Sequence, residues 1–213
     1  MSPAPTRGPA PANQPHLVFD TGPLLCLGGS RELRAAVVPR YRHNAHWVDA
    51  VLNELRNLAS RPGHIGIAAG AASGTHSTWL PRPVSFSQGD ATDLTQIIDR
   101  LHNLADIKNA QRGKAISRRG NTHLGEAQSI LHARRYAYHL VSHDEDAKRV
   151  AVENNVQPLT IVTLARTLVA DRASAKLLAG SLITLSTRNI DIGETVRGEL
   201  DLMPPRKPRL PPS

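Results

Sequence analysis

Short apolar runs alternate with longer amphipathic stretches along most of the chain. The apolar runs, each short enough to be a strand, are LVF (17–19), HWV (46–48), YHLVS (138–142) and VQPLTIV (156–162). Helices are expected over 23–38 with a break at Gly28 and Gly29, and over 49–59, 93–105, 123–137, 144–155 and 164–182. Alternation of this kind predicts an α/β fold with a mainly parallel sheet.

The clearest helical pattern lies in DLTQIIDRLHNLA (93–105). Its apolar residues fall on one helix face and are Leu94, Ile97, Ile98, Leu101 and Leu104. The stretch 61–90 is rich in Gly, Ala, Ser and Pro and has no clear period, although LPRPVSFS (80–87) is compatible with an edge strand. Asn121 or Thr122 is expected to cap the helix that follows.

Both ends of the chain are rich in proline, which sustains neither a helix nor a central strand. Residues 1–16 and 204–213 are therefore expected to be disordered tails. The length of 213 residues suits one domain with extensions. We expect that domain over 17–170 and a helical extension over 171–203.

Charge and composition narrow the possible partners and compartments. Lys and Arg number 26 against 18 Asp and Glu, and the pI is near 10.4, which favours a phosphate-rich partner or an acidic protein surface. The single cysteine, Cys26, lies in an apolar run and has no partner for an internal disulfide, so a reducing cytoplasm is expected. No run approaches the roughly 20 apolar residues of a spanning helix, and no signal peptide is recognised, so a membrane location is not expected.

An acidic residue follows the first apolar run, in LVFDTG (17–22). The letters DTG also open the active site of aspartic proteases, in which two such loops share a proton between their carboxylates. Those enzymes are all-β, whereas here one DTG is followed by a helical pattern. An aspartic protease is therefore not expected.

Four acids occupy comparable places in successive strand–helix units. Asp20 and Asp144 each follow an expected strand, and the carboxyl ends of parallel strands meet at one edge of the sheet, where ligands bind. Glu54 and Glu126 each interrupt an apolar helical pattern. Buried carboxylates need a compensating charge, and oxygen ligands without paired Cys or His favour Mg²⁺ or Mn²⁺ over zinc. Taken singly, each acid could instead be a turn, cap or surface residue.

In this order and context, the motifs resemble those of the PIN-domain ribonucleases, which include toxins of the VapC type. The resemblance covers about 17–170 and depends on the apolar strand ending in Asp20 with TGPLL behind it, on Glu54 in VLNEL, on Glu126 in GEAQSILHA, and on Asp144 and Asp146 in VSHDEDAKRVA. It implies a three-layer α/β/α sandwich whose acids hold Mg²⁺ or Mn²⁺ and cleave RNA.

Carried over by position, the resemblance implies that Asp20, Glu126 and Asp144 hold the metal ion, that Glu54 completes the cluster and that Asp146 is a fifth catalytic acid. It further implies a cytoplasmic endoribonuclease, either the toxin of a toxin–antitoxin pair or a defence effector, with a protein antitoxin as partner and a homodimer as the usual assembly. The products would carry 5′-phosphate and 3′-hydroxyl ends. The alternative is a non-catalytic module of the same fold that binds nucleic acid or a partner.

Two hydroxyl residues and a histidine lie beside these acids in the sequence. Ser142 and Thr21 are candidates for orienting Asp20, although either hydroxyl could bond to local backbone instead. Ser142, His143 and Asp144 are consecutive, and neighbours on a strand point to opposite faces, so they cannot form a nucleophilic triad. His143 is therefore expected to have no role at the site.

The interval between Glu54 and Glu126 spans 72 positions, longer than in the compact toxins, so insertions are expected at about 61–90 and 108–121. The second contains no acid. Its basic residues are Lys108, Arg112, Lys114, Arg118 and Arg119, and the last four are candidates for contacting RNA phosphates. A solvated loop is the alternative. Since aromatic residues amount to 3% of the chain, recognition is expected to be electrostatic rather than by base stacking.

Overall fold

The structure is a computed structural model that describes residues 14–74, 80–113 and 123–203. Several predictions fall outside these ranges: most of the N-terminal tail, the whole C-terminal tail, and three candidate RNA-binding residues, Lys114, Arg118 and Arg119.

The described residues form a four-stranded sheet with the strand order β2-β1-β3-β4, and every pairing is parallel. The strands are β1 (Leu17–Phe19), β2 (Ala45–His46), β3 (His139–Val141) and β4 (Pro158–Leu159). The prediction of an α/β fold with a parallel sheet is confirmed.

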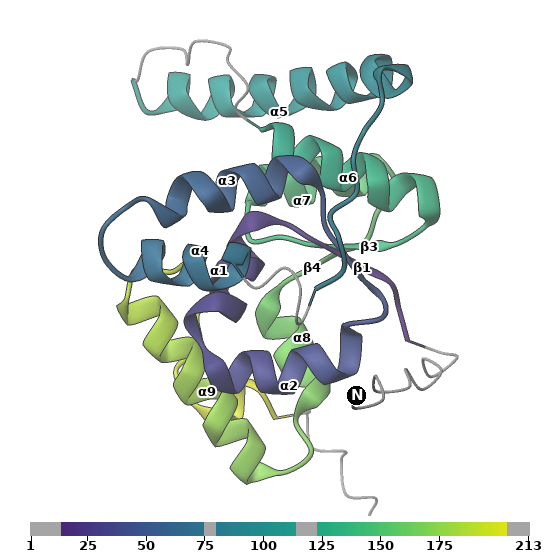
Figure 1. Cartoon of the computed structure of the whole chain (residues 1–213). Helices are drawn as coiled ribbons and strands as arrows, with labels where there is room; N and C mark the ends of the chain where they lie inside the picture. Colours follow the sequence, from purple (N-terminus) through teal and green to yellow (C-terminus); the bar gives the residue numbers. More distant parts are fainter. Residues whose placement is uncertain (1–13, 75–79, 114–122, 204–213) are drawn as a thin grey trace, which may run out of the picture.

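Nine α-helices surround the sheet in the described part of the chain (Figure 1). They are α1 (Thr21–Gly29), α2 (Arg31–Tyr41), α3 (Asp49–Ala59), α4 (His64–Gly74), α5 (Ala91–Gln111), α6 (Leu124–Tyr136), α7 (Glu145–Glu153), α8 (Ile161–Leu168) and α9 (Arg172–Thr187). Two 3₁₀ turns, η1 (Gln88–Asp90) and η2 (Glu199–Asp201), complete the elements.

The strands bury alternate residues on opposite faces of the sheet. Leu17 and Phe19 pack in one core with α1, α2, α8 and α9, whereas Val18 and Leu140 pack in a second core with α5, α6 and α7. Figure 1 shows α5, α6 and α7 above the strands and α2, α8 and α9 below them. This arrangement is compatible with a three-layer α/β/α sandwich.

Helix α4 falls in the stretch for which the sequence has no clear period. Its buried residues are small, and a Cβ placed on Gly28 of α1 would lie 2.1 Å from the carbonyl oxygen of Ala68 in α4. The two helices therefore approach backbone to backbone at a distance that only glycine allows. Nearby, the expected edge strand at 80–87 is reduced to one parallel bridge between Val84 and Val48.

Two boundaries differ from the predictions because polar side chains cap helices there. The run VQPLTIV is a strand only at Pro158–Leu159, since the Thr160 hydroxyl accepts from the Thr163 amide and starts α8. The single helix expected over 164–182 is split, because Asp171 caps α9 in a capping box with Ser174. Helix α6 begins after His123, which occupies the cap position with φ 71°. The predicted cap residues, Asn121 and Thr122, lie outside the described residues.

The segment expected as an extension, 171–203, shares the core of the first face. Leu178, Leu182 and Leu185 of α9 are buried in the same cluster as Phe19. Residues 190–202 add further apolar side chains to it, among them Ile192 and Leu202. Over the described ranges, no helix is long and apolar enough to cross a membrane.

Candidate active site at the ends of strands β1 and β3

The strand order places a topological switch point between β1 and β3. From β1 the chain first passes to β2 on one side, and later elements return to β3 on the other side. Connections that leave in opposite directions open a crevice at the carboxyl ends of such strands, where ligands bind in open α/β sheets. Asp20 directly follows β1, and Ser142 and Asp144 directly follow β3.

Asp20 lies at this switch point, directly after β1, and is 6% exposed. Its Oδ1 accepts a hydrogen bond of 2.7 Å from the Thr21 amide, and its Oδ2 accepts one of 2.8 Å from the Ser142 hydroxyl. Burial raises the pKa of Asp20 from 3.8 to about 8; the charge of Glu126 adds to this rise, and the two hydrogen bonds oppose it. The carboxylate is thus oriented from both adjacent strand ends, yet its negative charge is not neutralised.

Glu54 reaches the same place from α3. Its Oε2 accepts a hydrogen bond of 2.5 Å from the Thr21 hydroxyl. Burial is the main cause that raises the pKa of Glu54, and the charge of Glu126 contributes in the same direction. A Cβ on Gly125, in the first turn of α6, would lie 2.5 Å from Glu54 Oε1. The glycine therefore permits α6 to approach the carboxylate of α3.

Glu126, in the first turn of α6, connects the two halves of the cluster. Its charge acts on Asp20, on Glu54 and on His123, whose Nδ1 lies 3.6 Å from Glu126 Oε1. The nearby Glu126 carboxylate is the main cause that raises the pKa of His123, and the charges of Asp144 and Asp146 add to it. Glu126 Oε2 is buried and has no hydrogen-bond partner among the described residues.

Asp144 and Asp146 lie at the start of α7. Asp144 caps this helix, because its Oδ1 accepts from the Ala147 amide at 2.8 Å, and its own amide donates to the Ser142 hydroxyl at 3.2 Å. The capping role considered for Asp144 is thus present. Asp144 is exposed, and the cap uses only one of its two carboxylate oxygens. Asp146 instead pairs with Lys108, whose Nζ lies 2.7 Å from its Oδ1.

Asp20, Glu54 and Glu126 come from three separate elements, and the charge of Glu126 acts on the other two. The backbone amide of Asp144 is linked to the carboxylate of Asp20 through the Ser142 hydroxyl. Within the described ranges, no three His, Cys, Asp or Glu side chains stand ready around one metal position. The donor chemistry nevertheless fits a hard cation, because the cluster offers carboxylate oxygens and Glu126 Oε2 is buried without a partner. Mg²⁺ or Mn²⁺ would offset the charge that burial leaves uncompensated.

The structure adds three residues to those singled out from the sequence. His123 and Gly125 contact Glu126 and Glu54, and Lys108 pairs with Asp146. The contact between His123 and Glu126 could have been expected from the sequence, because residues three positions apart are neighbours on a helix. Lys108 could not be matched to Asp146 from the sequence, because 38 positions separate them.

His143 is buried beside the site, where it packs between elements. It is 6% exposed, and its ring lies against Gly22 and Gly193. Its Nε2 accepts a hydrogen bond of 3.4 Å from the Ile161 amide, and burial lowers its pKa to about 4. His143 therefore joins the end of β3 to α1, α8 and the segment after α9.

Of the candidate RNA-binding residues, Arg112 is described, at the exposed C-terminal end of α5. Comparisons with protein-family models, with curated proteins and with solved structures give no match for this chain. A functional proposal therefore depends on the residues gathered at the ends of β1 and β3.

Proposed function

We propose that this chain is a metal-dependent endoribonuclease with a PIN-like fold. The observation that carries the proposal is the convergence of Asp20, Glu54 and Glu126 at the switch point of a parallel sheet, with Asp144 beside them. Several carboxylates held close together in a partly buried crevice create a demand for a divalent cation. In phosphodiester hydrolysis, a cation held by carboxylates stabilises the charge that develops on the phosphate and activates the attacking water.

In this proposal Asp20, Glu126 and Asp144 hold Mg²⁺ or Mn²⁺. When bound, the cation supplies positive charge that stabilises the phosphate undergoing attack and acidifies the attacking water. Thr21 and Ser142 fix the carboxylates, since the Thr21 hydroxyl donates to Glu54 and the Ser142 hydroxyl donates to Asp20. Preorganised carboxylates of this kind need little rearrangement during the reaction.

The substrate is RNA, held mainly through its phosphates. The formal charge of +8 and the basic residues that follow α5 support a polyanionic ligand. In keeping with the family that the motifs resemble, we propose that the chain acts as the toxin of a toxin–antitoxin pair or as a related defence effector. A protein antitoxin would then cover the acidic crevice, and a homodimer would be the working assembly.

Cleavage of end-labelled single-stranded RNA by purified protein tests the nuclease directly. Wild type should cut in Mg²⁺ or Mn²⁺ and stop in EDTA, and Asp20→Asn and Asp144→Asn should each lower the rate at least about 100-fold, as expected for loss of a group that holds the cation. Products with 5′-phosphate and 3′-hydroxyl ends are expected. A 2′,3′-cyclic phosphate product, or full activity in EDTA, would contradict the metal-dependent mechanism.

A non-catalytic module that binds nucleic acid or a partner is the second candidate. It is favoured by the absence, in the described part of the chain, of three ligands already arranged for a metal ion, and by the pairing of Asp146 with Lys108. In that case Asp20→Asn and Asp144→Asn would leave RNA affinity and biological effect unchanged. The same two variants therefore separate the candidates.

A further inference from the structure

The ion pair between Lys108 and Asp146 joins the C-terminal part of α5 to the first turn of α7, next to Asp144. The ammonium of Lys108 is 2.7 Å from Asp146 Oδ1, and the two side chains are 44% and 13% exposed. Asp146 lies in the first turn of α7, two positions after Asp144. On the same side of the sheet, His102 of α5 packs against His123, whose Nδ1 lies 3.6 Å from Glu126 Oε1. The pair therefore places a lysine next to the acids through which the reaction is proposed to occur.

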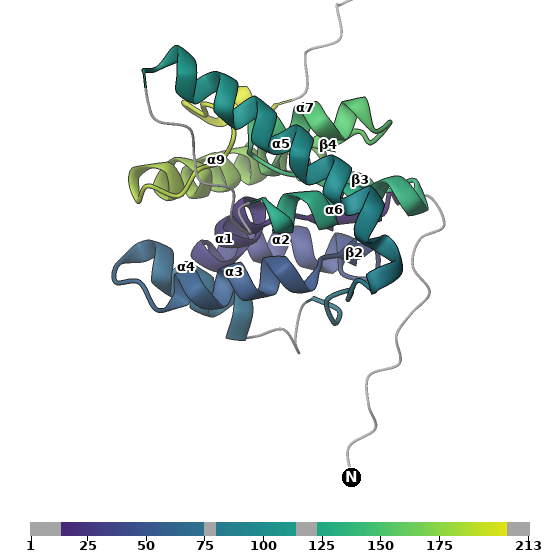
Figure 2. The same ribbon diagram turned by 90° about the horizontal axis from the view of Figure 1, so that it is seen from above.

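Helix α5 holds Lys108 in this position. It lies across the outer side of α6 and α7 (Figures 1 and 2), and Leu101 and Leu104 bury its inner face. Arg100 makes two hydrogen bonds of 2.8 Å to the carboxylate of Glu153 at the end of α7. The ring of His102 packs edge-on against His123 at 5.3 Å. Lys108 thus projects from an anchored helix.

The geometry separates the two aspartates of α7. Asp144 is exposed and caps the helix with one oxygen. Asp146 is largely covered, and its charge is already matched by an ammonium at hydrogen-bonding distance. Because the ammonium already compensates the charge of this carboxylate, a metal ion would stabilise it less. The ammonium of Lys108, by contrast, has three N–H donors, and the lysine side chain is 44% exposed.

We propose that Lys108 contacts a phosphate of single-stranded RNA beside the acidic crevice, and that Asp146 is a positioning residue for Lys108 rather than a metal ligand. This inference deepens the proposed function and rests on it for the identity of the substrate. By resemblance, Asp146 was expected to be a catalytic acid, and this inference gives it a different role. It also adds Lys108 to the candidate RNA-binding residues.

Binding of a fluorescein-labelled single-stranded RNA, measured by anisotropy in EDTA at several salt concentrations, tests the lysine without any cleavage. Lys108→Met should weaken binding about fivefold at moderate salt and reduce the slope of log K against log salt by about 0.7, the value for one lost phosphate contact. Lys108→Arg should retain binding within about twofold. Lys176→Met, on α9 at the far side of the sheet, is the matched control and should bind as wild type.

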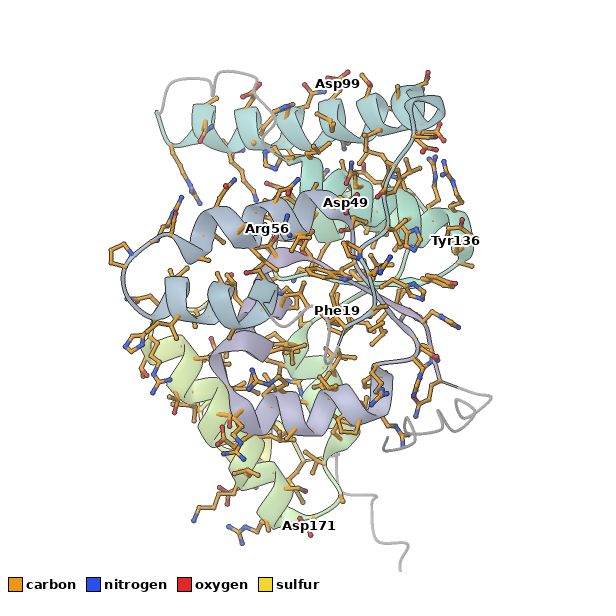
Figure 3. All side chains as sticks on the ribbon, in the orientation of Figure 1. Phe19, Asp49, Arg56, Asp99, Tyr136 and Asp171 are labelled. Atoms are coloured by element: carbon orange, nitrogen blue, oxygen red, sulfur yellow. The ribbon has the colours of Figure 1, made fainter. Side chains whose placement is uncertain are left out.

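Figure 3 shows the separation that the control uses. Asp99 on α5 and Asp171 at the start of α9 lie at opposite ends of the molecule, with Phe19 of the sheet between them. Loss of affinity in both lysine variants would reflect net charge alone and would overturn the local contact. Wild-type affinity in Lys108→Met would overturn it as well.

A double-mutant cycle tests the positioning role. In the wild-type background, Lys108→Met should weaken RNA binding about fivefold. In the Asp146→Asn background the same substitution should weaken RNA binding less than about twofold, because the lysine is no longer held in place by its ion pair. An equal or larger loss in that background would overturn the role. Calorimetric titration with Mn²⁺ provides a second readout: Asp146→Asn should bind within about twofold of wild type, whereas Asp20→Asn should lose binding. Equal losses in both would make Asp146 a metal ligand.

These outcomes remain distinguishable from failure of the proposed function. If wild type binds RNA through Lys108 and cuts nothing in Mg²⁺ or Mn²⁺, the nuclease proposal fails and the phosphate contact stands. If wild type cuts and Lys108→Met cuts and binds equally well, the phosphate contact fails and the nuclease stands.

Discussion

The carboxylate of Asp20 is held by the Thr21 amide and the Ser142 hydroxyl in a position where water is largely excluded. Two hydrogen bonds do not offset the removal of a charge from water when Glu126 and Glu54 stand nearby with charges of the same sign. Ser142 also accepts from the Asp144 amide, so one hydroxyl joins the ends of both strands. At the residue scale, the crevice is specified by a few short side chains around a destabilised anion.

The raised pKa of Asp20 predicts how stability depends on pH without metal. Between about pH 4 and 8 the folded protein keeps a proton that the unfolded chain has released, so stability falls as pH rises through this window. Asp20→Asn removes that loss and should raise the free energy of unfolding at pH 8 by about 1 kcal/mol or more, which is roughly 2–4 °C in Tm. Chemical denaturation of wild type and Asp20→Asn in EDTA, at pH 5 and at pH 8, measures the change in the free energy of unfolding with pH.

Asp99→Asn, at an exposed acid of α5, is the matched control and should leave the difference between the two pH values unchanged. If Asp20→Asn proves less stable than wild type at pH 8, the carboxylate is not the source of the pH dependence.

At the scale of elements, the crevice depends on how closely α3 and α6 approach. The first turn of α6 contains Gly125, and a side chain there would meet the Glu54 carboxylate that Thr21 holds. Helix α1 and α4 approach in a similar way at Gly28. Glycines at these two crossings therefore set how closely the helices approach, and Gly125 also sets where the Glu54 carboxylate can lie.

Gly125→Ala should displace Glu54 and lower the rate of RNA cleavage about tenfold or more, because a shift of the order of 1 Å in a catalytic group has effects of that size. Its free energy of unfolding should change by about 1 kcal/mol at most, since alanine favours the helix while the contact opposes it. Cleavage rates and thermal melts of the purified variant measure both.

Gly180→Ala in α9 provides the comparison, since no atom lies within 4 Å of the added Cβ. It should stabilise the protein by about 0.5–1 kcal/mol and leave cleavage unchanged. Wild-type cleavage by Gly125→Ala would show that the position of Glu54 does not matter for the reaction.

At the scale of the whole molecule, the sheet separates two cores, and the C-terminal segment belongs to one of them. Leu182 is fully buried in the cluster that contains Phe19, and Ile192 and Leu202 extend that cluster beyond α9. Helix α5 covers the other face through Ile97 and Leu101. Helices α5 and α9 therefore pack on opposite faces of the sheet whose strand ends carry Asp20 and Asp144. Neither helix contributes one of the four clustered acids.

Leu182→Ala should lower the free energy of unfolding by about 2–5 kcal/mol, as expected for a leucine removed from a packed core. Circular dichroism melts and urea denaturation measure the loss, which should involve the whole helical signal because α9 shares its core with β1. Leu177→Ala, at a position of the same helix that is 56% exposed, should change stability by about 0.5 kcal/mol or less. A small loss for Leu182→Ala would make 171–203 a separate unit.

Local pattern in the sequence was sufficient for most elements. The apolar run ending in Asp20 predicts β1, the helical spacing of DAVLNELRNLA predicts α3 with its observed limits, and the stripe from Leu94 to Leu104 predicts α5. Polar caps were less visible, because Thr160 and Asp171 act through hydrogen bonds to residues three positions ahead. Helix α4 was missed, since its small residues form no amphipathic stripe and its stability comes from packing against α1 and α3.

The sequence by itself determined the alternating fold class, the acids that follow β1 and β3, and the two helical acids, because these depend on periodicities of two and 3.6 residues within short segments. Only the tertiary structure decided that Glu54 and Glu126 meet Asp20, that His123 contacts Glu126, and that Lys108 pairs with Asp146. The physical reason is that strand order and helix crossings are set by packing between distant segments, and no local pattern encodes which distant side chains share a crevice.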